Sequence, residues 1–357
     1  MGFLAKGLNR FLNIVSTDIA IDLGTANVLV YVKEKGVVLN EPTIVAINKK
    51  TGQLVAVGQE AKAMLGRTPQ HVEVIRPLVE GVISDFEVTE EMLSYLINKV
   101  QNEVNTLITP RILIGVPSGI TNVEMRAASD ASKNAGARDV FLIEEPMAAA
   151  IGAKLSIGKA GGNMIIDIGG GTTDIAVISL NGIVVSKNLR VAGDHLNSSI
   201  TSYVRDQFKV YIGDKTAEEV KINLASLKMD EPNNEMVIRG RDVMTGLPRE
   251  VIVTSGDVHN AIIGHMDSIL EAVKAVLEKT PPEVLSDVMQ KGIHLCGGGA
   301  LIPGLAKFLE EELKVPVLVV PDPLRSVIRG LGIVVENLEQ YEEVLIDNEG
   351  ELSSYNS

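Results

Sequence analysis

Apolar and polar positions follow the same short pattern at two places along this chain. The segment Asn163–Gly182 reads NMIIDIGGGTTDIAVISLNG: an apolar run ending near Asp167, a glycine-rich stretch, then a second apolar run. Short, β-branched apolar runs predict buried strands, and adjacent glycines permit a tight turn between them. Asn181-Gly182 after the second run is typical of a hairpin turn. Because Ile19–Gly36, IAIDLGTANVLVYVKEKG, repeats this order, we predict a strand, a glycine-rich turn and a strand at both places.

These glycine-rich turns are candidate phosphate sites. Consecutive glycines let several backbone N–H groups point at one anion, and threonine hydroxyls add donors. Asp22 and Asp167 end the first strand of each copy, and carboxylates suit Mg²⁺ held through its waters. Each turn alone also suits an ordinary hairpin, but two turns facing each other would clamp phosphate between two related domains. A dinucleotide-binding loop is disfavoured because it opens a helix, and the P-loop string is absent.

Other motifs predict helix starts. Capping boxes occur at Thr121–Glu124 and Thr216–Glu219, and Pro146 is typical of a first helical position. The two carboxylates before that proline, Glu144 and Glu145, have two interpretations. They either favour the positive end of the helix or place a carboxylate at the cleft to orient a water.

Two further features lie in the second half of the chain. Glu218 and Lys221 are three residues apart on a predicted helix, where an exposed ion pair is the ordinary interpretation. Gly297–Gly299 lies between a predicted strand and a helix entered near Pro303, so this turn can approach a flat ligand closely. Cys296 beside it is expected to be a small buried strand residue.

Composition narrows the classes of function. The 357 residues suffice for two domains, and the 45% of apolar residues supply two cores. A net charge of −13 argues against a nucleic-acid binder, because no excess of basic residues neutralises phosphates. One cysteine excludes an internal disulfide, and no apolar run is long enough to span a membrane. We therefore expect a cytoplasmic protein.

The N-terminal segment predicts an amphipathic helix with a basic polar face. Such a helix can lie in a membrane interface, although packing on the domain or disorder would also suit the segment. The apolar face would carry Phe3, Leu4, Leu8, Phe11, Leu12 and Val15.

The chain resembles the MreB family of bacterial actins, within the actin, heat-shock chaperone and sugar-kinase ATPase superfamily. The resemblance covers nearly the whole length and rests on IDLGTANVLVYVK, VLNEPTIVAI, GRTPQHVEVIRPLVEGVISDF, FLIEEPMAAAIGA, DIGGGTTDIAVISL, GDKTAEEVK and GGGALI. It implies an α/β, actin-like fold: two related lobes, each with a mixed sheet flanked by helices, and ATP with Mg²⁺ in the cleft between them.

The resemblance also implies roles for individual residues. Asp22 and Asp167 would hold the metal through water, and Glu145, Thr172 and Asp167 would form the catalytic set, with Glu145 and Thr172 positioning the attacking water. Glu218 and Lys221 would contact the adenosine. The residues lining the phosphates would be Gly24, Thr25, Ala26, Asn27, Gly169, Gly170, Gly171 and Thr172. Those under the adenosine would be Gly297, Gly298 and Gly299. Leu107 and Ile108 would form an apolar membrane loop, unless they belong to the core.

The sequence departs from the family pattern at four positions. Ala192 and Asn197 stand where many members have Gly and Asp, and Ile328 and Leu331 stand where smaller residues are usual. None of these departures removes a catalytic group.

The resemblance further implies an organisation and a function. Residues 17–150 with about 322–343 would form the first lobe, with an insert at about 37–80. Residues 151–321 would form the second, with an insert at about 190–253. Residues 1–16 would be the amphipathic helix and 344–357 a disordered tail.

The expected function is a membrane-associated ATPase that forms filaments on the inner face of the cell membrane, with the cell-wall elongation machinery as partner, and maintains rod shape. A small-molecule kinase, a chaperone and a non-polymerising switch of the same fold are the alternatives.

Overall fold

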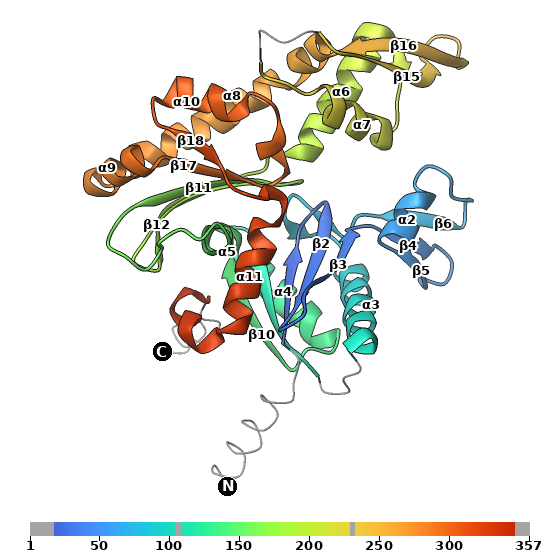
Figure 1. Cartoon of the computed structure of the whole chain (residues 1–357). Helices are drawn as coiled ribbons and strands as arrows, with labels where there is room; N and C mark the ends of the chain where they lie inside the picture. The colour runs from blue at the N-terminus through green and yellow to red at the C-terminus, as the bar shows by residue number, and fades with distance from the viewer. Residues whose placement is uncertain (1–17, 105–108, 229–232, 347–357) are drawn as a thin grey trace. The chain divides into compact units, whose positions relative to one another are not determined.

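The computed structural model describes residues 18–104, 109–228 and 233–346. The chain divides into two compact units (Figure 1). Unit 1 comprises Met1–Ser156 and Arg325–Ser357, and unit 2 comprises Ile157–Leu324. In the described parts of the chain, no helix has the length and apolar content that crossing a bilayer requires.

Unit 1 is built on a five-stranded mixed sheet in the order β10-β9-β1-β2-β3. β1 pairs antiparallel with β2 and parallel with β9, so the first predicted strand lies at the centre of the sheet. The five strands are β1 (Ile19–Leu23), β2 (Asn27–Val32), β3 (Gly36–Pro42), β9 (Arg111–Val116) and β10 (Asp139–Glu144).

Helices cover both faces of the unit 1 sheet (Figure 1). Ile19, Ile21 and Leu23 alternate along β1 and join one apolar core with α3 and α4. The other face packs against α5 and α11, where a Cβ at Gly330 would meet the carbonyl oxygen of Ala148 at 1.8 Å, so glycine permits this close helix crossing. The helices are α3 (Phe86–Val104), α4 (Asn122–Asn134), α5 (Glu145–Gly152) and α11 (Ser326–Glu336), followed by the 3₁₀ segment η3 (Leu338–Val344).

Smaller elements complete unit 1. A three-stranded sheet in the order β5-β4-β6 packs with α2, and a two-stranded hairpin precedes α3. Their bounds are β4 (Val45–Asn48), β5 (Leu54–Val57), α2 (Gln59–Met64), β6 (Val72–Ile75), β7 (Leu78–Val79) and β8 (Val82–Ile83).

Unit 2 repeats the central arrangement with the order β13-β12-β11-β17-β18. β11 pairs antiparallel with β12 and parallel with β17, as β1 does with β2 and β9. The strands are β11 (Asn163–Ile168), β12 (Thr173–Ser179), β13 (Gly182–Leu189), β17 (Ile293–Cys296) and β18 (Val317–Val319).

Five helices and a second sheet surround this core. Met164, Ile166 and Ile168 of β11 pack into an apolar cluster with residues of α6, α7, α8 and α10. The helices are α6 (Gly193–Phe208), α7 (Asp214–Leu224), α8 (Ser255–Lys279), α9 (Pro282–Lys291) and α10 (Leu305–Leu313), with the 3₁₀ segments η1 (Gly298–Leu301) and η2 (Pro323–Arg325). The small sheet contains β14 (Val210–Tyr211), β15 (Glu235–Asp242) and β16 (Pro248–Thr254).

Of three local motifs in the sequence, two predicted the structure correctly and one did not. The hairpin after β12 is confirmed, with Leu180 and Asn181 both at positive φ. The capping box at Thr121 is confirmed, since its hydroxyl accepts from the amide of Glu124 and the carboxylate caps in return. The predicted box at Thr216 is wrong: α7 begins at Asp214 with Gly213 as its N-cap and no side-chain cap.

Candidate functional site

In unit 1, Asp22 lies near the C-terminal end of β1. Its neighbours Ile21 and Leu23 point into the core, so alternation along the strand places Asp22 on the other face, beside Gly115 of β9. Burial raises the pKa of Asp22 to about 7. A carboxyl group that has lost water in this way gains from a nearby cation, because positive charge favours its ionised form.

Glu145 begins α5 at the same edge of the sheet. A Cβ built on Gly115 would lie 3.4 Å from its Cγ and 3.5 Å from Cδ1 of Leu331. An added Cβ at Gly115 would thus make ordinary van der Waals contact with the Glu145 side chain, which places Glu145 close to the strand position paired with Asp22. Sequence reasoning missed this glycine, although a glycine inside the apolar strand RILIGV was a visible signal.

The neighbouring carboxylate, Glu144, is bound by the loop that follows β9. Hydrogen bonds from the Ser118 side chain and the Gly119 backbone favour its charged form, but burial has the larger effect and raises its pKa. Because these partners lie in the loop after β9, Glu144 fixes the end of β10 to that loop. The Glu144 carboxylate is therefore bonded to the loop after β9, whereas the Glu145 side chain lies beside Gly115 of β9. Of the two glutamates, Glu145 is the better candidate for orienting a water.

The turn after β1 is pinned by Thr43, a buried residue that sequence reasoning missed. The Thr43 hydroxyl donates to the carbonyl oxygen of Gly24 at 2.6 Å, and its amide donates to that of Ala26 at 3.0 Å. A Cβ on Gly24 would lie 2.7 Å from the carbonyl oxygen of Asn27, so the turn requires glycine there. These contacts hold the backbone of this predicted phosphate-binding turn in one conformation.

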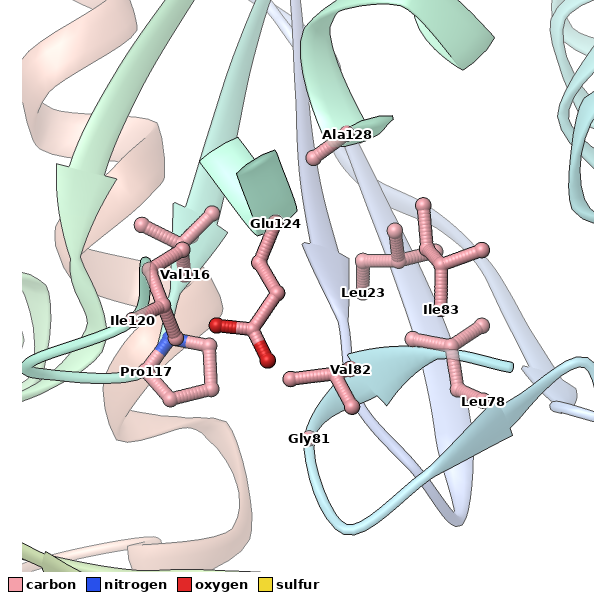
Figure 2. A pocket seen from close by; sticks show the side chains of 11 residues that line it. Leu23, Leu78, Gly81, Val82, Ile83, Val116, Pro117, Ile120, Glu124 and Ala128 are labelled. Carbon is pink, nitrogen blue, oxygen red and sulfur yellow. The ribbon is translucent and has the colours of Figure 1, made fainter. Parts of the chain in front are cut away.

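Thr25 in the same turn is fixed by the β7–β8 hairpin. The amide of Gly81 donates to the Thr25 hydroxyl oxygen at 2.9 Å, which leaves the hydroxyl proton to be donated to another group. Beside this contact lies a cavity of about 20 Å³, room for roughly one water, into which Leu23 and the carboxylate of Glu124 point (Figure 2). The cavity is therefore a gap beside the turn and is too small to be a nucleotide pocket.

In unit 2, Asp167 holds the corresponding place at the end of β11. It lies directly opposite Asp174 of β12, and both carboxylates are buried. Asn188 donates to both oxygens of Asp174 at 3.0 Å, which stabilises that charge beside Asp167. Sequence reasoning missed Asp174, although its place in the GGGTTD string was visible. The turn closes where the amide of Gly169 donates to the carbonyl oxygen of Thr172 at 2.9 Å.

The triple-glycine turn after β17 packs directly on the end of β11. A Cβ on Gly297 would lie 2.3 Å from both Asp167 Oδ1 and the carbonyl oxygen of Ile168, and one on Gly299 would lie 2.3 Å from Cγ2 of Ile168. Side chains at these two glycines would therefore displace Asp167 or its neighbour. Cys296 just before the turn is fully buried, as expected.

The start of α6 joins the 169–172 turn to α7. The amides of Gly193 and Asp194 donate to the carbonyl oxygens of Gly169 and Gly170 at 3.2 and 2.8 Å. Lys221 Nζ donates to the carbonyl oxygen of Gly193 at 3.2 Å and to Glu218 Oε2 at 2.8 Å.

The Glu218–Lys221 pair predicted from spacing is therefore confirmed. It is not the exposed pair of the ordinary interpretation, because the Lys221 side chain is only 16% exposed.

The remaining sequence predictions concern membrane residues and departures from the family pattern. Phe3, Leu4, Leu8, Phe11, Leu12, Leu107 and Ile108 lie outside the described residues. Ala192 is the extended N-cap of α6. Ile328 and Leu331 are fully buried in α11.

Three comparisons with known proteins give a common result. A family model described as MreB/Mbl protein matches residues 16–343. The chain is 49% identical over 323 residues to the cell shape-determining protein Mbl of Bacillus subtilis (strain 168), covering 90% of this chain and 97% of that one. It is 46% identical over 338 residues to the cell shape-determining protein MreB of Escherichia coli (strain K12), covering 94% and 97%. The crystal structure of MreB5 of Spiroplasma citri bound to ADP superposes with a TM-score of 0.87 at 39% identity, covering 92% of this chain and 98% of that chain, so the predicted actin-like fold is confirmed.

Proposed function

Because the chain belongs to the MreB/Mbl protein family, we propose that it binds ATP with Mg²⁺ and assembles into filaments on the inner face of the cell membrane. Membership itself makes it an actin-like, filament-forming ATPase of the cell shape-determining class. The observation that carries the proposal is the repeated strand–turn–strand arrangement, in which Asp22 and Asp167 each lie one residue before the end of β1 or β11, next to a glycine-rich turn.

Each unit by itself carries candidate groups for the nucleotide. In unit 1 they are those of the 24–27 turn, with the Thr25 hydroxyl as a fixed donor. In unit 2 the 169–172 turn serves the phosphates, and Glu218 and Lys221 serve the nucleoside. In this proposal the Gly297–Gly299 turn, which packs on Asp167 and Ile168, also lies under the nucleoside, where the lack of side chains allows a flat group to approach closely. The structure of a relative with ADP bound supports this class of ligand.

Asp22 and Asp167 suit a hydrated Mg²⁺ ion better than they suit a metal ion that is coordinated by protein side chains alone. Among the described residues, no three His, Cys, Asp or Glu side chains gather as a metal site. Mg²⁺ commonly keeps several waters and takes one or two carboxylates together with phosphate oxygens, so Asp22 and Asp167 would hold it through water. The bound ion would neutralise charge that develops on the transferred phosphoryl group.

Glu145 is the proposed group that orients the attacking water, with Thr172 as its partner in that role. Positioning by such a side chain contributes about 10²- to 10⁴-fold to a rate. Glu145 lies beside Gly115 of β9, and Pro146 at the second position of α5 fixes the backbone that carries the carboxylate. No covalent intermediate is required, since positioning and electrostatic stabilisation account for phosphoryl transfer to water.

Replacement of this glutamate tests the catalytic part of the proposal. We expect Glu145→Gln to lower single-turnover phosphate release from Mg-ATP about 100-fold while ADP affinity changes less than about threefold. Glu144→Gln is the matched control, because the same change on the adjacent residue touches the loop at Ser118 and should leave hydrolysis within about twofold. Equal rates for Glu145→Gln and the wild type would remove Glu145 from the mechanism.

The membrane and cell-wall parts of the proposal rest on the family and on the sequence of the N-terminal segment. We propose that residues 1–16 and the Leu107–Ile108 loop dock on the lipid surface, and that membrane proteins of the cell-wall elongation machinery are the partners. The test is sedimentation with Mg-ATP, with and without anionic liposomes, for the full chain and for a form lacking residues 1–15. Filaments that follow liposomes only with the segment present support the anchor. A chain that binds ATP but stays monomeric would favour a kinase or a non-polymerising switch.

A further inference from the structure

Asn197 connects α6 to the carboxylate on α7 that is proposed to bind the nucleoside. Its Nδ2 donates to Glu218 Oε2 at 2.6 Å, and the same oxygen accepts from Lys221 Nζ at 2.8 Å. A carboxylate can only accept when ionised, so the amide must present its NH₂ group to Glu218. Two donors, one of them charged, thus hold one oxygen of Glu218 in a fixed place.

The second atom of the same amide marks an incomplete network. Asn197 Oδ1 is buried, and among the described residues it has no hydrogen-bond partner. A buried acceptor of this kind is ordinarily matched by a donor, and a water or a ligand donor would supply it. The Glu218 side chain beside it remains 41% exposed, so its carboxylate is accessible to a ligand.

The same network reaches the phosphate-binding turn of unit 2. Lys221 also donates to the carbonyl oxygen of Gly193, and the amide of Gly193 donates to that of Gly169. A displacement of Glu218 would therefore change the partners of Lys221, and through them the backbone next to the turn. Asn197 lies one turn along α6 from Gly193, on the helix that carries both contacts.

We propose that Asn197 is a positioning residue that fixes the Glu218 carboxylate for the hydroxyl or amino donors of a nucleoside phosphate. The proposal rests on the proposed function of this site. An amide at position 197 donates to Glu218, whereas an ionised Asp there would add a second carboxylate that competes for Lys221. The role is particular to a chain that carries Asn here.

A double-mutant cycle on the full chain tests this role, with ADP as the probe and calorimetry as the measurement. We expect Asn197→Ala to raise the Kd for ADP about 10- to 150-fold, as for the loss of a hydrogen bond to a charged group. In the Glu218→Ala background the same change should raise Kd less than twofold, because the residue acts through Glu218. Ser198→Ala, which removes an exposed hydroxyl from the adjacent position of α6, is the matched control and should leave Kd unchanged.

Asn197→Asp provides a second variant of the same shape. It should weaken ADP binding at least as much as Asn197→Ala, because it removes the donor and adds a charge. The proposal is overturned if either Asn197 variant binds ADP like the wild type, or if Asn197→Ala costs the same factor with and without Glu218. Failure of the wild type to bind ADP or ATP would instead overturn the proposed function, and this inference with it.

Discussion

Gly297 offers a sharp test of how the fold places Asp167. Its backbone has φ 78° and ψ 176°, a region that residues other than glycine rarely adopt, and an added Cβ would lie 2.3 Å from Asp167 Oδ1. Real Cβ atoms essentially never approach closer than 3.0 Å, so the carboxylate or the turn must move by about 0.7 Å. Gly297→Ala therefore combines backbone strain with displacement of a proposed catalytic acid.

Two magnitudes follow for Gly297→Ala. Strain in this backbone region costs about 1–3 kcal/mol, and overpacking costs a further 1–3 kcal/mol, so the free energy of unfolding should fall by about 2–6 kcal/mol. A misplacement approaching 1 Å at a reacting centre can cost about 100-fold in rate. We expect hydrolysis of Mg-ATP to fall by 10- to 100-fold at a temperature where circular dichroism shows the variant to be folded.

Gly292 is the matched control because it stands at the other end of β17. It has nearly the same backbone, φ 82° and ψ 173°, and an added Cβ would lie 2.8 Å from the carbonyl oxygen of Pro316, away from Asp167. Gly292→Ala should lose comparable stability in urea titration and keep its rate of hydrolysis when folded. If the two variants hydrolyse ATP equally, the reasoning that Gly297 makes room for Asp167 is refuted.

Two further predictions concern stability. Asp18 is 1% exposed, and Arg111 binds its carboxylate through two nitrogens. Arg111→Met would leave this carboxylate buried without its cation and should lower the free energy of unfolding, measured in urea, by about 3–5 kcal/mol. Adding Asp18→Leu should restore most of that loss in the double variant. Burial, and to a lesser extent the nearby His195, lowers the pKa of His265 from its ordinary value of 6.5 in the folded chain. As the pH falls below 6.5, the unfolded chain therefore binds a proton at this residue before the folded chain does. The free energy of unfolding should fall with it, while above pH 6.5 this contribution is fully present. His265→Gln should flatten that pH dependence, and an unchanged slope, or one equally flattened by replacing the exposed His71, would contradict the assignment.

The sequence by itself determined the local elements and the residue types at the site. Short β-branched apolar runs and glycine-rich turns identified the strands that contain Asp22 and Asp167 near their ends, because both signals are properties of neighbouring residues. The spacing of Glu218 and Lys221 predicted their ion pair for the same reason. Local signals failed at Thr216, where Gly213 and Asp214 start α7 earlier. A capping sequence shows that a helix can begin at a residue, and packing of the helix decides whether it does.

Only the tertiary structure decided which distant groups hold these residues in place. Thr25 is fixed by Gly81, and Asp167 has room because Gly297 lacks a side chain, although 130 positions separate the latter two in the sequence. Asn197 reaches Glu218 across two helices, which converts an ordinary helical ion pair into a three-residue network. No periodicity records such contacts, because they arise where sheets and helices pack together. The sequence therefore supplied the candidate groups of the proposed site, while packing set their positions and their electrostatic surroundings.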